Sequence, residues 1–181
     1  MSIPNLITLA RILLVPVVVW AIATANMDLA FVLFLVAAIS DAVDGFLAKR
    51  FGMMTELGAY LDPLADKVMI VSIYVTLGIM GIIPLWIVIL VVSRDLMIVG
   101  AIMLSWLVGQ PVEIRPHAIS KLNTGAQLFF ACLVLASHGF GFNAEPVLTL
   151  VMALVAVLTL LSVGFYLREW VRHMNSSETV S

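Results

Sequence analysis

Six apolar stretches, each about as long as a membrane-spanning helix, account for most of this 181-residue sequence. They cover approximately residues 8–25, 29–50, 59–80, 84–107, 118–138 and 146–170. A helix needs roughly 20 mostly apolar residues to cross the hydrocarbon core of a bilayer. Only 11% of the residues are charged, against about 25% in soluble domains. The sequence therefore predicts an all-α integral membrane bundle of six transmembrane helices.

Polar residues mark the two ends of this predicted bundle. The first stretch opens with Pro4-Asn5 and carries Arg11, so its first two turns suit a juxtamembrane position along the membrane surface. Residues 175–181, "NSSETVS", form a polar C-terminal tail. We expect residues 1–174 to be a single membrane domain.

Lysine and arginine lie on one side of the predicted bundle. On that side are Arg11, the Lys49-Arg50 loop, the Arg115 loop and the tail with Arg168 and Arg172. The opposite connections, "TANMD", "GIMGIIP" and "SHGFGFNAEP", contain neither residue. Because cytoplasmic loops are enriched in basic residues, this pattern predicts that both termini are cytoplasmic, in a membrane such as the bacterial inner membrane.

Four aspartates lie near the cytoplasmic ends of the second and third stretches. Asp41 and Asp44 are three residues apart, and Asp62 and Asp66 four apart, so each pair shares one helix face. The loop between them reverses the chain, and at about 1.5 Å per residue both pairs lie roughly 6–13 Å from the helix ends. A carboxylate at membrane depth is costly and is usually functional. We therefore expect four carboxylates to converge at one depth.

Such a cluster of carboxylates requires cations, because like charges repel strongly in a poorly hydrated site. Oxygen ligands without histidine or cysteine favour Mg²⁺ or Mn²⁺ over zinc. Two such ions would hold a phosphate and stabilise an in-line displacement at phosphorus. Gly45 and Gly58, beside the carboxylates, would let a ligand approach the helix backbone.

Two other interpretations of the aspartates remain open at this point. They could pair with the cations Lys67, Arg94 and Lys121 and have no chemical role. They could also belong to a cation transporter or to a non-catalytic membrane scaffold. Transport pathways usually spread carboxylates across the bilayer, whereas these gather at one face, which favours an enzyme supplied from the cytoplasm.

The stretch "DAVDGFLAKRFGMMTELGAYLDPLADK" resembles the signature of the CDP-alcohol phosphotransferase family. The matching residues are Asp41, Asp44, Gly45, Ala48, Gly58, Asp62 and Asp66. The resemblance extends from "SIPNLITLARIL" to about Gln127 and implies a six-helix membrane enzyme that uses the liponucleotide CDP-diacylglycerol. It also implies that the first three aspartates bind two divalent metal ions. Asp66 would lie at the same site and take the proton of the acceptor hydroxyl.

Several basic residues are candidates for substrate binding. Lys49 stands where the family usually has arginine, and Arg50 follows it, so either could serve the nucleotide or its phosphates. Arg94, which adjoins Asp95 on a different helix face, is expected to contact a substrate phosphate or to position the carboxylates. Arg115 and Lys121 flank the start of a cytoplasmic helix, where they could hold a lipid phosphate or anchor the helix at the interface.

Four short stretches bear on the acceptor alcohol. "IPNLITLAR" and "LDPLADK" resemble the phosphatidylglycerophosphate synthase and cardiolipin synthase group, and "VVSRDLMIVGA" and "ISKLNTGAQL" resemble mitochondrial-type cardiolipin synthases. They favour phosphatidylglycerol as acceptor, giving cardiolipin and CMP, with glycerol 3-phosphate, giving phosphatidylglycerophosphate, as the alternative. We expect a lipid bilayer as surroundings and no nucleic-acid partner. Faces of small residues permit a homodimer without requiring one.

Overall fold

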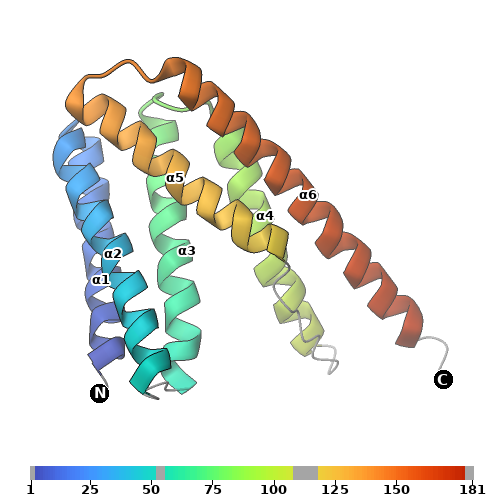
Figure 1. Cartoon of the computed structure of the whole chain (residues 1–181). Helices are drawn as coiled ribbons and strands as arrows, with labels where there is room; N and C mark the ends of the chain where they lie inside the picture. Colours follow the sequence, from blue (N-terminus) through green and yellow to red (C-terminus); the bar gives the residue numbers. More distant parts are fainter. Residues whose placement is uncertain (1–2, 52–55, 108–117, 178–181) are drawn as a thin grey trace.

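The computed structural model describes residues 3–51, 56–107 and 118–177, with side chains described for 7–41, 65–100 and 118–168. These ranges form six helices (Figure 1). They are α1 (Ile3–Ala23), α2 (Met27–Phe51), α3 (Glu56–Ile79), α4 (Leu85–Leu107), α5 (Ala118–Phe140) and α6 (Glu145–Ser177). The predicted all-α class and helix count are confirmed. α6 continues through Ser177, so it includes the first residues of the predicted tail.

Short connections of three to five residues join the helices at the end of the bundle opposite the termini. α3 and α5 are each followed by a glycine with a positive φ, 70° at Gly81 and 66° at Gly141, a conformation that ends helices at little steric cost. The Asn143 side-chain oxygen accepts a hydrogen bond from the backbone N–H of Glu145 at 3.1 Å, which caps the start of α6. Local sequence alone therefore explains where these helices begin and end.

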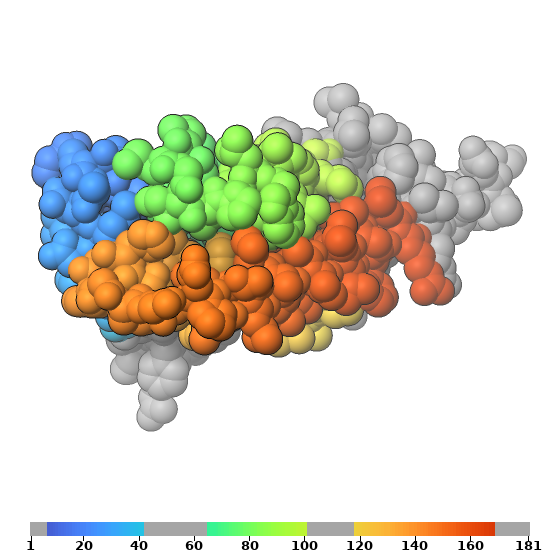
Figure 2. Space-filling view, turned by 90° about the horizontal axis from the view of Figure 1, so that it is seen from above, coloured from blue at the N-terminus to red at the C-terminus, as the bar shows by residue number. Residues whose placement is uncertain are grey.

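The N- and C-termini lie at the same end of the bundle (Figure 1). α1 packs against α2 and α3, while α5 crosses α2 and α3 obliquely and then packs along α6. Seen from above, α6 runs beside α4 (Figure 2). The helix ends nearest the basic segments thus gather at the end that holds both termini, as an even number of membrane crossings requires.

The exposed surface is strongly apolar. The core holds residues such as Ile22, Ile73, Tyr74 and Val134, yet many large apolar side chains remain on the outside. The most exposed include Leu13, Trp20, Ile79, Ile89, Leu96, Phe129 and Leu150, each more than half accessible. A soluble monomer rarely exposes so large an apolar area, whereas lipid covers it in a membrane.

Two helical segments in the described part of the chain are long and apolar enough to cross a membrane by themselves. They are Ala118–Phe140 and Glu145–Arg168. Together with the apolar exterior, they are consistent with an integral membrane protein. That all six helices span the bilayer stays a prediction.

Candidate active site

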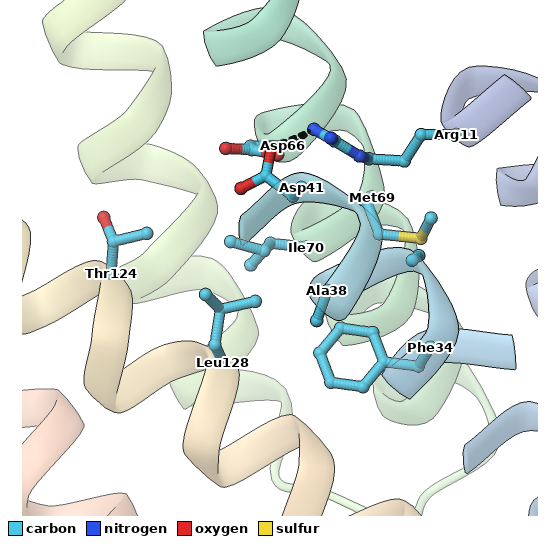
Figure 3. Close-up of a pocket in the computed structure, with 10 residues that line it drawn as sticks. Arg11, Phe34, Ala38, Asp41, Asp66, Met69, Ile70, Thr124 and Leu128 are labelled. Carbon is cyan, nitrogen blue, oxygen red and sulfur yellow. Dashed lines mark hydrogen bonds and ion pairs between the residues drawn. The ribbon is translucent and has the colours of Figure 1, made fainter. Parts of the chain in front are cut away.

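A cavity of about 70 Å³ opens between α1, α2, α3 and α5 (Figure 3). Its lining consists of Arg11, Phe34, Ala37, Ala38, Asp41, Asp66, Met69, Ile70, Thr124 and Leu128. Most of this wall is apolar, and the charged groups gather where α1, α2 and α3 meet (Figure 3). A cavity of this size holds a few waters or small ions, so it can accommodate the reacting groups of a substrate but not its lipid chains.

Arg11 of α1 joins the carboxylates of α2 and α3. Its Nη1 lies 2.5 Å from Oδ1 of Asp41 and 2.8 Å from Oδ1 of Asp66, to which it donates a hydrogen bond. The Arg11 side chain is only 3% exposed, whereas the two carboxylates are about 40% exposed (39% and 41%). The cation thus lies behind the carboxylates, and the carboxylates face the cavity.

The predicted convergence of two aspartate-bearing helices is present for the residues that the structure describes. Asp41 and Asp66 belong to different helices and share one nitrogen of Arg11. α2 is helical through Phe51 and α3 from Glu56. Asp44 therefore lies in the same helix as Asp41, and Asp62 lies in the same helix as Asp66. Only the helical backbone is described at Asp44, Gly45, Ala48, Lys49, Arg50, Gly58 and Asp62, and Arg115 lies outside the described residues altogether.

A second buried arginine, Arg94 of α4, lies at a separate polar cluster. Its Nη1 lies 2.6 Å from Oδ1 of Asp95, and its Nη2 donates to Ser120 Oγ of α5 at 2.5 Å. Its Nε and Nη2 both donate to Ser162 Oγ of α6, at 3.2 and 3.0 Å. The guanidinium carbon also lies 6.0 Å from the ring centroid of Tyr166. Asp95 in addition pairs with Lys67 of α3.

The sequence places Arg94 and Asp95 on different helix faces and leaves local pairing open, and in the structure the long arginine side chain does reach back to its neighbour. Arg94 does not line the cavity, and its side chain is 1% exposed with all three nitrogens hydrogen-bonded to protein. Its link to the site runs through Asp95 to Lys67, which follows Asp66 directly.

Lys121 lies on the cavity side of α5 by helical register. Thr124 and Leu128, three and seven residues later, line the cavity. Lys121 itself is exposed, one turn nearer the start of α5. Its position therefore suits a contact with a group that enters the cavity from the predicted cytoplasmic end.

Comparison with known proteins identifies the family. The sequence profile of the CDP-alcohol phosphatidyltransferase family matches residues 1–163. This chain belongs to that family.

Relatives in this phosphatidyltransferase family fall into two named groups. The chain is 30% identical over 181 residues to a human protein named cardiolipin synthase (CMP-forming), covering 91% of this chain and 60% of the relative. It is 38% identical over 101 residues to a probable phosphatidylglycerophosphate synthase of Mycobacterium tuberculosis H37Rv, covering 52% of this chain and 48% of the relative. It is 29% identical over 178 residues to the CDP-diacylglycerol–glycerol-3-phosphate 3-phosphatidyltransferase of Bacillus subtilis, covering 89% and 91%. The chain thus spans about 60% of the human relative, and the names do not decide the acceptor.

The family is one of enzymes that use a divalent metal ion, and the cavity fits such an ion. Asp41 and Asp66 offer oxygen atoms from two helices to one space, which matches the ligand preference of Mg²⁺ or Mn²⁺. In the part of the chain with described side chains, no group of three or more potential ligands occurs. A complete metal site would need Asp44 and Asp62 from the adjacent turns.

Two site residues were missed by reasoning from the sequence alone. Arg11 indicates topology in the sequence and counts there among the cations of the cytoplasmic half, yet in the structure it contacts two of the predicted metal ligands, Asp41 and Asp66. Asp95 was not assigned a role, although it holds both Lys67 and Arg94. Charge balance is the sequence signal that could have revealed both roles, because an arginine at membrane depth needs an anionic or strongly polar partner.

Proposed function

We propose that this protein transfers the phosphatidyl group of CDP-diacylglycerol to phosphatidylglycerol, forming cardiolipin and releasing CMP. The observation that carries the proposal is the pair of partly exposed carboxylates, Asp41 and Asp66, in an otherwise largely apolar cavity of a phosphatidyltransferase-family chain. Acyl chains can remain in the bilayer around such a bundle while only the headgroups meet the carboxylates.

Asp66 takes the proton of the acceptor hydroxyl in this mechanism. The freed oxygen forms a bond to the lipid-side phosphorus of CDP-diacylglycerol, and the bond from that phosphorus to the CMP oxygen breaks. Asp41, Asp44, Asp62 and Asp66 would hold two Mg²⁺ or Mn²⁺ ions. When bound, these ions neutralise the charge that develops on the diphosphate and on the leaving CMP.

Other residues would bind and orient the substrates. Gly45, Ala48 and Gly58 would leave space for the nucleotide beside the helix backbones, and Lys49 or Arg50 would contact its phosphates. Lys121 and Arg115 would hold the acceptor phosphate near the start of α5. The role of Arg94 that its contacts support is the positioning one, through Asp95 and Lys67.

The apolar wall of the cavity supports a lipid acceptor. Phe34, Met69, Ile70 and Leu128 lie beside the two carboxylates, and such a wall suits the glycerol ester region of phosphatidylglycerol. The basic residues named above can serve the phosphate of either acceptor, so they do not discriminate between the two.

Glycerol 3-phosphate remains the second candidate acceptor. It is favoured by the Bacillus subtilis relative, whose name specifies that acceptor and of which 91% is covered. Purified protein in detergent with Mg²⁺ and CDP-diacylglycerol should form cardiolipin when phosphatidylglycerol is added. Formation of phosphatidylglycerophosphate alone would reverse the assignment of the acceptor and leave the phosphatidyltransferase chemistry intact.

We further propose that residues 1–174 act as one domain that crosses the bilayer six times, with both termini and the site cytoplasmic. The basic residues near the end that holds both termini support this orientation. In a Cys132→Ser background, cysteines introduced by Met53→Cys and Asn143→Cys should react with an impermeant thiol reagent from opposite sides. Labelling from the same side would refute the six-span arrangement. Crosslinking in the membrane would test the homodimer that small-residue faces permit.

A further inference from the structure

The unassigned feature with the clearest geometry is the contact of one arginine nitrogen with two candidate metal ligands. Arg11 Nη1 meets Oδ1 of Asp41 on α2 and Oδ1 of Asp66 on α3. In each carboxylate one oxygen faces Arg11, while the other is turned away from it (Figure 3). One donor nitrogen thus contacts both carboxylates and restrains the distance between them.

We propose that Arg11 is a positioning residue that clamps Asp41 and Asp66 in the geometry required for divalent metal binding. The proposal rests on the proposed metal site, but it concerns a residue that the site itself does not include. Arg11 holds one oxygen of each carboxylate, and both carboxylates remain about 40% exposed (39% and 41%).

Burial makes Arg11 suited to this role. The side chain is 3% exposed and enters from α1, which packs against both α2 and α3. A buried, hydrogen-bonded guanidinium loses little further freedom when metal binds, so its two contacts are already organised. Ligands held in this way by a neighbouring hydrogen bond bind metal more tightly, and removing such a partner typically costs about 10–100-fold in affinity.

Electrostatic repulsion by Arg11 would act in the opposite direction and weaken metal binding. This alternative makes the proposal falsifiable. A positive charge close to a cation site repels the cation. If Arg11 were only a counter-charge that competes with metal, its removal would tighten metal binding. If Arg11 only held α1 against the bundle, its removal would lower thermal stability and leave the affinity unchanged.

The experiment measures Mn²⁺ binding to the purified full-length protein in detergent, without lipid substrates, from the electron paramagnetic resonance signal of free Mn²⁺. We expect Arg11→Gln to weaken Mn²⁺ binding by about 10–100-fold. Arg11→Lys keeps the charge but loses the rigid fork, so its affinity should lie between wild type and Arg11→Gln. Thr159→Val removes a buried hydrogen bond from Thr159 Oγ1 to Asn123 Oδ1 between α6 and α5, outside the cavity lining, and its Mn²⁺ affinity should stay within about twofold of wild type.

Tighter or unchanged Mn²⁺ binding in Arg11→Gln would overturn the proposal. So would an effect of equal size in Thr159→Val, because the loss would then reflect general loosening of the bundle. Should Arg11→Gln not fold, Arg11→Lys decides: wild-type or tighter affinity contradicts the clamp. Absence of Mn²⁺ binding in the wild-type protein would refute the metal site and the clamp together. Metal binding in wild type with no loss in the variants would refute the clamp alone.

Discussion

The two buried arginines of this protein have opposite surroundings. Arg11 shares one nitrogen between two partly exposed carboxylates that open onto a cavity, so anions outnumber the cation. Arg94 has all three nitrogens bonded inside the bundle, and its partner Asp95 also serves Lys67, so cations outnumber the anion. Both clusters contain buried charged groups. They differ in the exposure of their carboxylates and in the balance of positive and negative charge.

This difference indicates where chemistry can occur. A surplus of accessible negative charge attracts divalent cations and, through them, phosphates. The Arg94 cluster has its arginine nitrogens hydrogen-bonded within the bundle and can fix the positions of α3, α4, α5 and α6. We therefore propose catalysis at the Asp41–Asp66 cavity and a structural, positioning role for the Arg94 cluster.

Substitution of one aspartate in each cluster should give the largest difference in enzymatic activity between the two clusters. Asp66→Asn removes the base, and we expect CMP release to fall about 10²–10⁴-fold while the protein remains folded. Asp95→Asn alters the Arg94 cluster, and activity per folded molecule should remain within about tenfold of wild type. CMP release from CDP-diacylglycerol and phosphatidylglycerol provides the measurement. Equal losses in the two variants would remove the functional distinction.

The Arg94 cluster should matter more for stability than for activity. Arg94→Ala leaves Asp95 buried with only Lys67 as partner, and we expect the free energy of unfolding to fall by about 3–5 kcal/mol. Arg94→Lys should lose less, because it retains a charge near Asp95 while losing donors to the two serines. Denaturant titration in mixed micelles would measure both. A change below about 1 kcal/mol in Arg94→Ala would show that the cluster does not hold the helices together.

The helix α5, which lines the cavity with Thr124 and Leu128, can be displaced by a substitution far from both arginines. A Cβ at Gly139 would lie 2.7 Å from the Asp28 backbone nitrogen and 2.8 Å from its Cα, so Gly139→Ala forces α5 away from the start of α2. We expect a loss of about 1–3 kcal/mol in stability. Gly125→Ala on the same helix meets nothing within 4 Å and serves as the control. It should be neutral or gain up to about 1 kcal/mol. Thermal unfolding of both variants measures the contrast, and equal shifts would contradict this packing.

The smallest expected effect concerns a hydrogen bond in the interface between α5 and α6. Thr159 Oγ1 donates to Asn123 Oδ1 at 3.0 Å, with both residues fully buried. Thr159→Val removes this bond, and a loss of about 0.6 kcal/mol is expected, as for other interhelical bonds in membranes. Thr149→Val, at an exposed position where the hydroxyl bonds only the backbone of its own helix, should change stability less. The same unfolding assay would detect a reversed order, which would count against this hydrogen bond as a contributor to stability.

Much of this fold follows from local sequence. The apolar stretches gave the six helices with bounds close to those observed, because helix length and membrane solvation depend on composition over about 20 residues. Spacings of three and four residues predicted which aspartates share a helix face. The same residues carried the resemblance to the family that the profile match now shows.

The partners of the charges were decided by tertiary structure. Arg11 and Asp66 are 55 residues apart, and no periodic pattern within either helix indicates that they meet. Sequence reasoning offered Lys67 and Arg94 as partners of the site aspartates, whereas both pair with Asp95. Helix faces are determined by local periodicity, but the choice among several nearby cations depends on how the helices rotate and cross when their side chains pack. Sequence therefore determined the helices and the aspartate pairs, while the packing of α1 and α4 decided which arginine faces the cavity and which is sealed within the bundle.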